Sequence, residues 1–229
     1  MNNEPQEPFF NVVPLFPSSV VMVNVEGDTS ELLDTSDVPV MASSFSDPSD
    51  STTRNGIQRN RVLERFPTTK KILLDTFTAV AEQALGYKKK EYGITTSWLT
   101  TCNRGEGSVS HCHKNSFYSC VYYYQEEYPE GTSGIVFDNP NVDKMSYFFQ
   151  NSDIDQVNPS NSLSCTFRPE SNIMLVFPSY LNHNVLQHGL GTQRKSLAFN
   201  VVPLSAYGEH DSSYDQEWFT PTLANWKYR

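Results

Sequence analysis

Two histidines separated by a single residue open the stretch HCHKNSFYSCVYYYQ, residues 111–125. In a β-strand, residues i and i+2 project from the same face, so His111 and His113 would present their imidazoles side by side. Two adjacent imidazoles can chelate a transition metal ion. The HxH pattern alone leaves two interpretations open, a metal site or a pair of hydrogen-bonded surface histidines.

A third histidine and a cation follow later in the chain. The apolar stretch IMLVFPSYLNHN predicts a strand and then a loop that carries His183. Further along, Arg194 and Ser196 would share one face of a strand in RKSLAFNVV, which should otherwise be buried. An unpaired buried charge is costly, so a cation at this place requires an anionic partner.

These segments together resemble a family of small 2-oxoglutarate/Fe(II)-dependent oxygenases of bacteria and phages, within the prolyl-hydroxylase-like superfamily. The resemblance covers nearly the whole chain, from FFNVVPLFPSSV near the N-terminus to RKSLAFNV at 194–201. Its most specific parts are the HxHxNS block, which starts at His111, and FPSYLNH, which ends at His183. The other matching positions are Trp98, Gly105, Ser119, Val121, Tyr122, Tyr123 and the segment GIVFDNP at 134–140.

The family resemblance implies a fold and a set of residue roles. The implied fold is mainly β with flanking helices, a double-stranded β-helix of the jelly-roll or cupin-like kind. His111 and His183 would be ligands of Fe(II), and Arg194 with Ser196 would bind the distal carboxylate of 2-oxoglutarate, with O2 as cosubstrate. Three more residues are candidates for cosubstrate binding, with turn capping or sheet packing as the alternative role: Asn115, Ser116 and Tyr123.

One position departs from the wider superfamily. The usual iron site has two histidines and one carboxylate, yet His113 occupies the carboxylate position, two residues after His111. Either His113 is a third metal ligand, and the dianionic cosubstrate then offsets the charge of the iron, or it hydrogen-bonds near the metal without binding it. In the second case Asp138 is the candidate carboxylate.

The predicted secondary structure is one helix followed by short strands. A helix is expected within 67–86, capped by Thr68 or Thr69 and ended by Gly86. After it come β-rich runs bounded by Gly, Pro, Asn and Ser, which favour a β-sandwich or barrel. These runs lie at 94–101, 117–124, 134–138, 173–178 and 195–202.

The size and charge of the chain limit the class of protein to which it can belong. We expect the 229 residues to form a single domain. The N-terminal strand, loops and supporting helix would occupy 1–91, the β core 92–205 and a C-terminal arm 206–229. A net charge of -9 argues against nucleic acid as a partner. The aromatic arm would either pack back on the body of the protein or contact a second subunit in a homodimer.

The cysteines indicate a reducing compartment. Four cysteines without CxxC spacing, and no signal-peptide pattern, are typical of a cytoplasmic protein, here of a bacterium or a phage-infected host cell. Cys112 and Cys120 are interpreted as core thiols, and His188 and His210 as solvent-exposed histidines. No apolar stretch approaches the roughly 20 residues that span a bilayer.

The expected activity is hydroxylation of an unactivated C–H bond, with conversion of 2-oxoglutarate to succinate and CO2. The substrate would be a protein side chain or a small metabolite, selected by the polar loops 26–60 and 141–162. One alternative is a cupin-like three-histidine metalloenzyme that does not use 2-oxoglutarate, which leaves Arg194 and Ser196 without a role. The other is a non-catalytic β-sandwich, a binding or structural protein of a phage, which the aromatic arm fits better.

Overall fold

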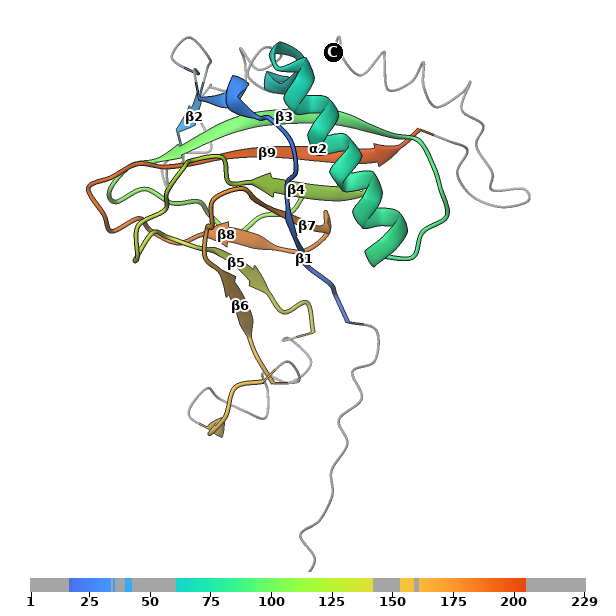
Figure 1. Ribbon diagram of the computed structural model, residues 1–229. Coiled ribbons are helices and arrows are strands. Elements are labelled where there is room, and N and C mark those ends of the chain that lie inside the picture. Colours follow the sequence, from blue (N-terminus) through green and yellow to red (C-terminus); the bar gives the residue numbers. More distant parts are fainter. Residues whose placement is uncertain are drawn as a thin grey trace, which may run out of the picture.

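The computed structural model describes the N-terminal strand, the helix and the β core of the chain (Figure 1). The described residues are 17–33, 35, 40–42, 61–141, 153–158 and 161–204. The expected C-terminal arm, His210 and most of the two polar loops lie outside them. The division into one domain with an arm therefore stays a prediction.

Two β-sheets form the core. The larger has the strand order β1 (Val21–Asn24), β7 (Ile173–Pro178), β4 (Tyr118–Tyr122), β9 (Arg194–Pro203), β3 (Tyr92–Cys102) and β2 (Val40–Ala42). The smaller has the order β6 (Ser164–Phe167), β5 (Ile135–Asp138) and β8 (His183–Val185). All strand pairs are antiparallel except β2 with β3.

Helix α2 (Pro67–Ala79) and the π-helical turn η4 (Val80–Ala84) cover the outer face of the larger sheet (Figure 1). Phe77 is fully buried there, and its ring lies edge-on to Tyr92 with centroids 5.0 Å apart. Short 3-10 turns, η1 (Ser30–Leu32) and η3 (Val62–Arg65), add Leu32 and Leu63 to the same hydrophobic core.

The helix begins differently from the prediction. Pro67 occupies the first turn, where its missing N–H costs nothing, and neither Thr68 nor Thr69 acts as a side-chain cap. Instead, the backbone N–H of Thr69 donates to Glu31 Oε2 at 3.0 Å, so a distant segment satisfies the first turn. The predicted stop is confirmed, because Gly86 has φ 72°, a left-handed conformation that favours glycine.

The five predicted strands are confirmed, with ends that differ by at most two residues. Three strands had no clear signal in the sequence: β2, β6 and β8. Each has only three or four residues, which is too short for an alternating pattern to stand out. Among the described residues, no helix combines the length and the apolar character needed to cross a membrane.

The alternation of side chains along β9 separates the core from a cavity. Leu197, Phe199 and Val201 point into the core beneath α2. The intervening residues face the space between the two sheets, where Ala198 joins a second hydrophobic cluster that includes Phe137 and Phe177. Strand β9 is thus buried on both faces, and the face towards the cavity carries polar residues.

Candidate metal centre and carboxylate site

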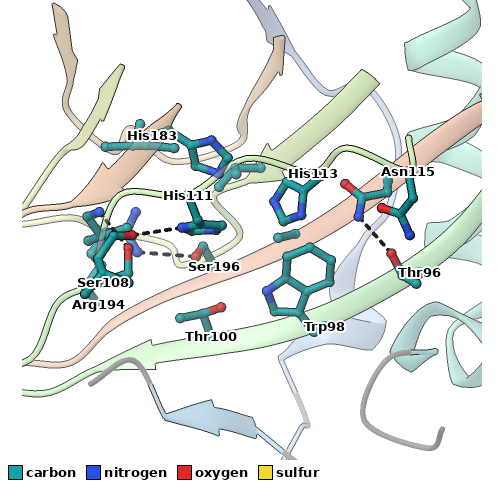
Figure 2. Close-up of a pocket in the computed structure, with 16 residues that line it drawn as sticks. Thr96, Trp98, Thr100, Ser108, His111, His113, Asn115, His183, Arg194 and Ser196 are labelled. Carbon is teal, nitrogen blue, oxygen red and sulfur yellow. Dashed lines mark hydrogen bonds between the residues drawn. The ribbon is translucent and has the colours of Figure 1, made fainter. Parts of the chain in front are cut away.

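A cavity of about 530 Å³ lies between the two sheets. Strands β3 and β9 form its floor, and the segment between β3 and β4 closes it on the other side (Figure 2). The polar residues that line it are Thr96, Thr100, Ser108, His111, His113, Asn115, His183, Arg194, Ser196 and Asn200. Trp98, Val109, Val121, Ile135, Val185 and Ala198 complete the lining.

Three imidazoles converge inside this cavity (Figure 2). His111, His113 and His183 each offer one ring nitrogen, and these atoms lie within 4.8 Å of one another. The ring centroids are 5.1 Å apart for His111 and His113, 4.5 Å for His111 and His183, and 5.3 Å for His113 and His183. Such a cluster can hold a metal ion.

Backbone contacts fix the tautomers of two of these rings. Nδ1 of His111 lies 2.9 Å from the carbonyl oxygen of Val109, and Nδ1 of His183 lies 2.9 Å from that of Leu181. A carbonyl only accepts, so each Nδ1 carries the proton and each Nε2 keeps a free lone pair. Histidine ligands of metals are commonly oriented in this way. The third ring, of His113, packs against Trp98 with centroids 5.5 Å apart.

The environment keeps two of the imidazoles neutral. Burial, together with the neighbouring imidazoles of His183 and His111, lowers the pKa of His113 from 6.5 to about 4. Burial also lowers the pKa of His183 to about 4, and the hydrogen bond to Leu181 only partly opposes this shift. Neutral imidazole is the form that binds metals.

The HxH pair does not lie on a regular strand, which corrects the geometry expected from the sequence. His111 forms an isolated β-bridge with His183, and the chain is irregular at His113. The segment turns here because Ser116 N–H donates to the carbonyl of His113. The two rings still lie on the same side, since His113 N–H donates to the carbonyl of Ser179 on the neighbouring segment.

Asp138, the alternative carboxylate, lies near the histidines but outside their cluster. Its Oδ2 accepts a hydrogen bond from Ser110 Oγ at 2.7 Å. Its negative charge acts on His183, where it raises the pKa against the effect of burial. Among the described residues, the cluster of possible ligands therefore consists of three histidines.

Arg194 is buried in the same cavity, with 1% of its surface exposed. Its Nε donates to the carbonyl of Ser133 at 3.0 Å. Its terminal nitrogens lie 3.3 Å from Ser196 Oγ and 3.3 Å from the hydroxyl of Tyr123. No described carboxylate forms an ion pair with it. The cation thus has neutral partners only, and an anionic partner has to come from outside these residues.

The remaining candidates for cosubstrate binding are placed in different surroundings. Tyr123 is fully buried beneath Arg194, whose guanidinium carbon lies 5.3 Å from the ring centroid. Asn115 lines the cavity at the end away from Arg194 (Figure 2). Ser116 lies outside that cavity and borders a second one. Neither Asn115 nor Ser116 is near Arg194, so both are poorly placed to bind the same carboxylate.

Two other interpretations of the sequence were wrong. His188 is buried, with 1% of its surface exposed, and its ring is hydrogen-bonded on both sides. Cys112 is only half-buried, because the HxH segment is a surface loop, whereas Cys120 is a core thiol as expected.

Sequence reasoning also missed two residues that shape the cavity. Ser133 contributes through its backbone carbonyl, for which a sequence holds no signal. Asn200 continues the alternating face of Arg194 and Ser196, and its Nδ2 donates to Thr96 Oγ1 at 2.9 Å. This polar residue at an inward position of a buried strand was a usable signal.

A protein family whose description is "Putative 2OG-Fe(II) oxygenase" matches residues 96–200. The matched segment contains all three histidines, Arg194 and Ser196. Residues 96–200, a little under half of the chain, therefore match the 2OG-Fe(II) oxygenase family. The description of this family names both 2-oxoglutarate and Fe(II), and the histidine cluster fits the metal. No curated protein matches the sequence.

Several solved structures resemble the chain at low sequence identity. The epimerase SnoN from nogalamycin biosynthesis has a TM-score of 0.54 at 9% identity, over 84% of this chain and 79% of SnoN. An oxygenase from Burkholderia pseudomallei has a TM-score of 0.42 at 15% identity, over 59% of this chain and 58% of that protein. A prolyl-4-hydroxylase from Pseudomonas putida has a TM-score of 0.39 at 15% identity, over 56% and 61%.

The likeness to SnoN concerns the fold, and with it the predicted double-stranded β-helix is confirmed. The chain spans only about three fifths of the length of the Burkholderia and Pseudomonas proteins.

Proposed function

We propose that this chain is a 2OG-Fe(II) dioxygenase that hydroxylates a neutral substrate and converts 2-oxoglutarate to succinate and CO2. One observation carries the proposal. A cluster of three metal-binding imidazoles and a buried guanidinium without an anionic partner line the same cavity. A neutral histidine cluster and an unpaired cation together fit a metal ion and a diacid.

His111, His113 and His183 would hold Fe(II). With three protein ligands, the ion would keep coordination positions for cosubstrates, as in the two-histidine, one-carboxylate oxygenases. When bound, Fe(II) supplies the oxidising chemistry with O2 and 2-oxoglutarate. The protein contributes the orientation of the imidazoles, which the carbonyls of Val109 and Leu181 fix before any metal arrives.

Arg194 would bind the distal carboxylate of 2-oxoglutarate. Guanidinium has five N–H groups, and three of them are used by Ser133, Ser196 and Tyr123. The remaining terminal N–H groups form a fork that matches a carboxylate. The negative charge of this carboxylate would also offset the positive charge of the buried guanidinium.

The opposite end of the cavity would receive the substrate. Asn200 lies about 20 Å further along β9 than Arg194, at roughly 3.3 Å per residue, and 2-oxoglutarate is much shorter. Trp98, Asn115 and Thr96 surround this end (Figure 2). Arg194 is the one Lys, Arg, Asp or Glu side chain among the described cavity residues, so a charged substrate group would have no partner.

The substrate would therefore offer amide or hydroxyl groups, together with an apolar part that packs on Trp98. A neutral protein side chain such as proline and an uncharged metabolite both meet this description. The four cysteines, all within the described residues, are free, which fits the proposed location in the reducing cytoplasm.

The cupin-like alternative without 2-oxoglutarate fits the cavity less well, because it leaves the buried charge of Arg194 unpaired. A direct test is the formation of succinate by Fe(II)-loaded protein under air. Even without substrate, we expect slow succinate formation that requires both Fe(II) and 2-oxoglutarate. A protein that binds the metal but forms no succinate, and binds 2-oxoglutarate no better than 2-oxovalerate, would exclude the proposal.

A further inference from the structure

His188 connects three chain segments at the end of the cavity that holds Arg194. Its backbone N–H donates to the carbonyl of Glu106 at 2.7 Å, and its own carbonyl accepts from Gly105 N–H at 2.7 Å. Its ring contacts Ser133 on one side and Thr192 on the other. The residue lines no part of the main cavity, so it does not touch the proposed cosubstrate.

The hydrogen bonds of the ring define its protonation. Nε2 lies 2.7 Å from the carbonyl oxygen of Thr192, and a carbonyl only accepts, so Nε2 carries the proton. Nδ1 then acts as the acceptor. It faces the backbone N–H of Ser133 at 3.4 Å and the hydroxyl of Ser133 at 3.3 Å. Nδ1 of His188 thus accepts hydrogen bonds from Ser133.

Ser133 in turn holds Arg194. The same residue whose N–H and hydroxyl face His188 offers its carbonyl oxygen to Arg194 Nε at 3.0 Å. This contact fixes the rotation of the planar guanidinium, because Nε lies in the plane of the two terminal nitrogens. The plane decides whether the free N–H fork faces the cavity beside Ser196.

We propose that His188 is a positioning residue that selects 2-oxoglutarate by its distal carboxylate, acting through Ser133 on the orientation of Arg194. The inference rests on the proposed function of the cavity, because it assigns the anion that Arg194 receives. Loss of the acceptor at Nδ1 should let the peptide of Ser133 shift and the fork turn away. The affinity for a distal carboxylate then falls, while the affinity for the 2-oxo acid end is unchanged.

Two amide variants separate the two hydrogen bonds of the ring. His188→Asn places an acceptor oxygen where Nδ1 lies and removes the contact with Thr192. His188→Gln places a donor close to Nε2 and removes the acceptor for Ser133. Both variants stay polar, and each loses the contacts of one ring nitrogen, so their effects on folding should be similar.

The measurement is calorimetric titration of the Ni(II)-loaded protein, which needs no turnover. The ligands are 2-oxoglutarate and 2-oxovalerate, which has a methyl group in place of the distal carboxylate. We expect His188→Gln to reduce the preference for 2-oxoglutarate about 10-fold, the scale of one hydrogen bond to a charged group. We expect His188→Asn to retain the preference within about 2-fold, and 2-oxovalerate to bind all proteins equally.

Tyr122→Phe is the matched control. Its hydroxyl donates to Asn172 Oδ1 at 2.7 Å and lies 2.8 Å from Thr29 Oγ1, so the variant removes hydrogen bonds away from the cavity. It should lower the melting temperature and leave the ligand preference unchanged. If His188→Gln and His188→Asn lower the melting temperature but both keep the wild-type preference, His188 only joins loops, and the inference is wrong. A wild-type protein without any preference for 2-oxoglutarate would instead refute the proposed function.

Discussion

His111 and His183 face each other across an antiparallel β-bridge, with each backbone N–H donating to the carbonyl of the other at 3.0 and 2.9 Å. Their ring centroids are 4.5 Å apart. The backbone therefore fixes the spacing of the two imidazoles, and each Nδ1 is already held by a carbonyl. The metal centre is preorganised, since little ordering remains to be done when an ion binds.

The metal ligands can be tested by exchanging one of them for a carboxylate. His183→Ala removes a buried ligand and should weaken Ni(II) binding by more than about 100-fold, beyond the effect of outer partners. His113→Asp restores the common two-histidine, one-carboxylate set and should keep binding within about 10-fold. Equilibrium dialysis measures both affinities. Equal loss in the two variants would show that this site does not accept a carboxylate in place of His113.

The stability of the metal-free protein should depend on pH through the buried histidines. Burial lowers the pKa of His113 and His183 from 6.5 to about 4, so the unfolded chain binds more protons between these values. The free energy of unfolding should therefore be nearly independent of these groups above pH 6.5 and fall as the pH drops towards 4. Urea denaturation at several pH values measures this slope.

The double variant His113→Gln/His183→Gln serves as the control for that experiment. It removes both titrating groups and should flatten the slope between pH 6.5 and pH 4. A slope as steep as in the wild type would show that other groups cause the acid sensitivity.

The role of Arg194 predicts a loss confined to 2-oxoglutarate. Arg194→Gln removes the charge and should weaken 2-oxoglutarate binding about 10- to 100-fold, the range for hydrogen bonds to a charged group. Ni(II) affinity should stay the same, because the guanidinium is not part of the histidine cluster. Calorimetry measures both. If the affinities for metal and 2-oxoglutarate fell together, the variant would have disturbed the whole cavity.

Packing of α2 on the larger sheet should dominate the stability of the core. Phe77 is fully buried, and its ring contacts Tyr92 and Tyr118. Phe77→Ala should lower the free energy of unfolding by about 3–5 kcal/mol. Lys71→Ala, which removes only an exposed ion pair with Asp75, should change it by less than about 1 kcal/mol. Guanidinium denaturation measures both free energies of unfolding. If α2 were a loosely attached element, the two variants would lower this free energy by comparable amounts.

The strand pattern and the β9 site residues were predictable because they follow local rules. Alternation along RKSLAFNVV placed Arg194 and Ser196 on one face, and both line the cavity. The period of the helix and the stop at Gly86 were likewise visible in the sequence. The histidine cluster was expected from a family resemblance together with the HxH spacing, rather than from spacing alone.

The environment of His188 could not be predicted, because its partners come from other segments. Its burial depends on Glu106, Ser133 and Thr192, and two of these contribute backbone carbonyls. The predicted cap of α2 was wrong for the same reason, since the backbone N–H of Thr69 donates to Glu31 on a distant segment. The backbone N–H of His113 likewise donates to the carbonyl of Ser179 on a distant segment, a contact that local alternation cannot anticipate.

The central claim is that one metal ion and one diacid occupy the same cavity, and anaerobic titration of 2-oxoglutarate into the Fe(II)-loaded protein tests it most directly. A chelate of 2-oxoglutarate with iron has a weak visible charge-transfer band. We predict that this band appears and saturates at one 2-oxoglutarate per iron, and that it requires higher 2-oxoglutarate in Arg194→Gln. Stoichiometric iron without such a band at any 2-oxoglutarate concentration would contradict the account.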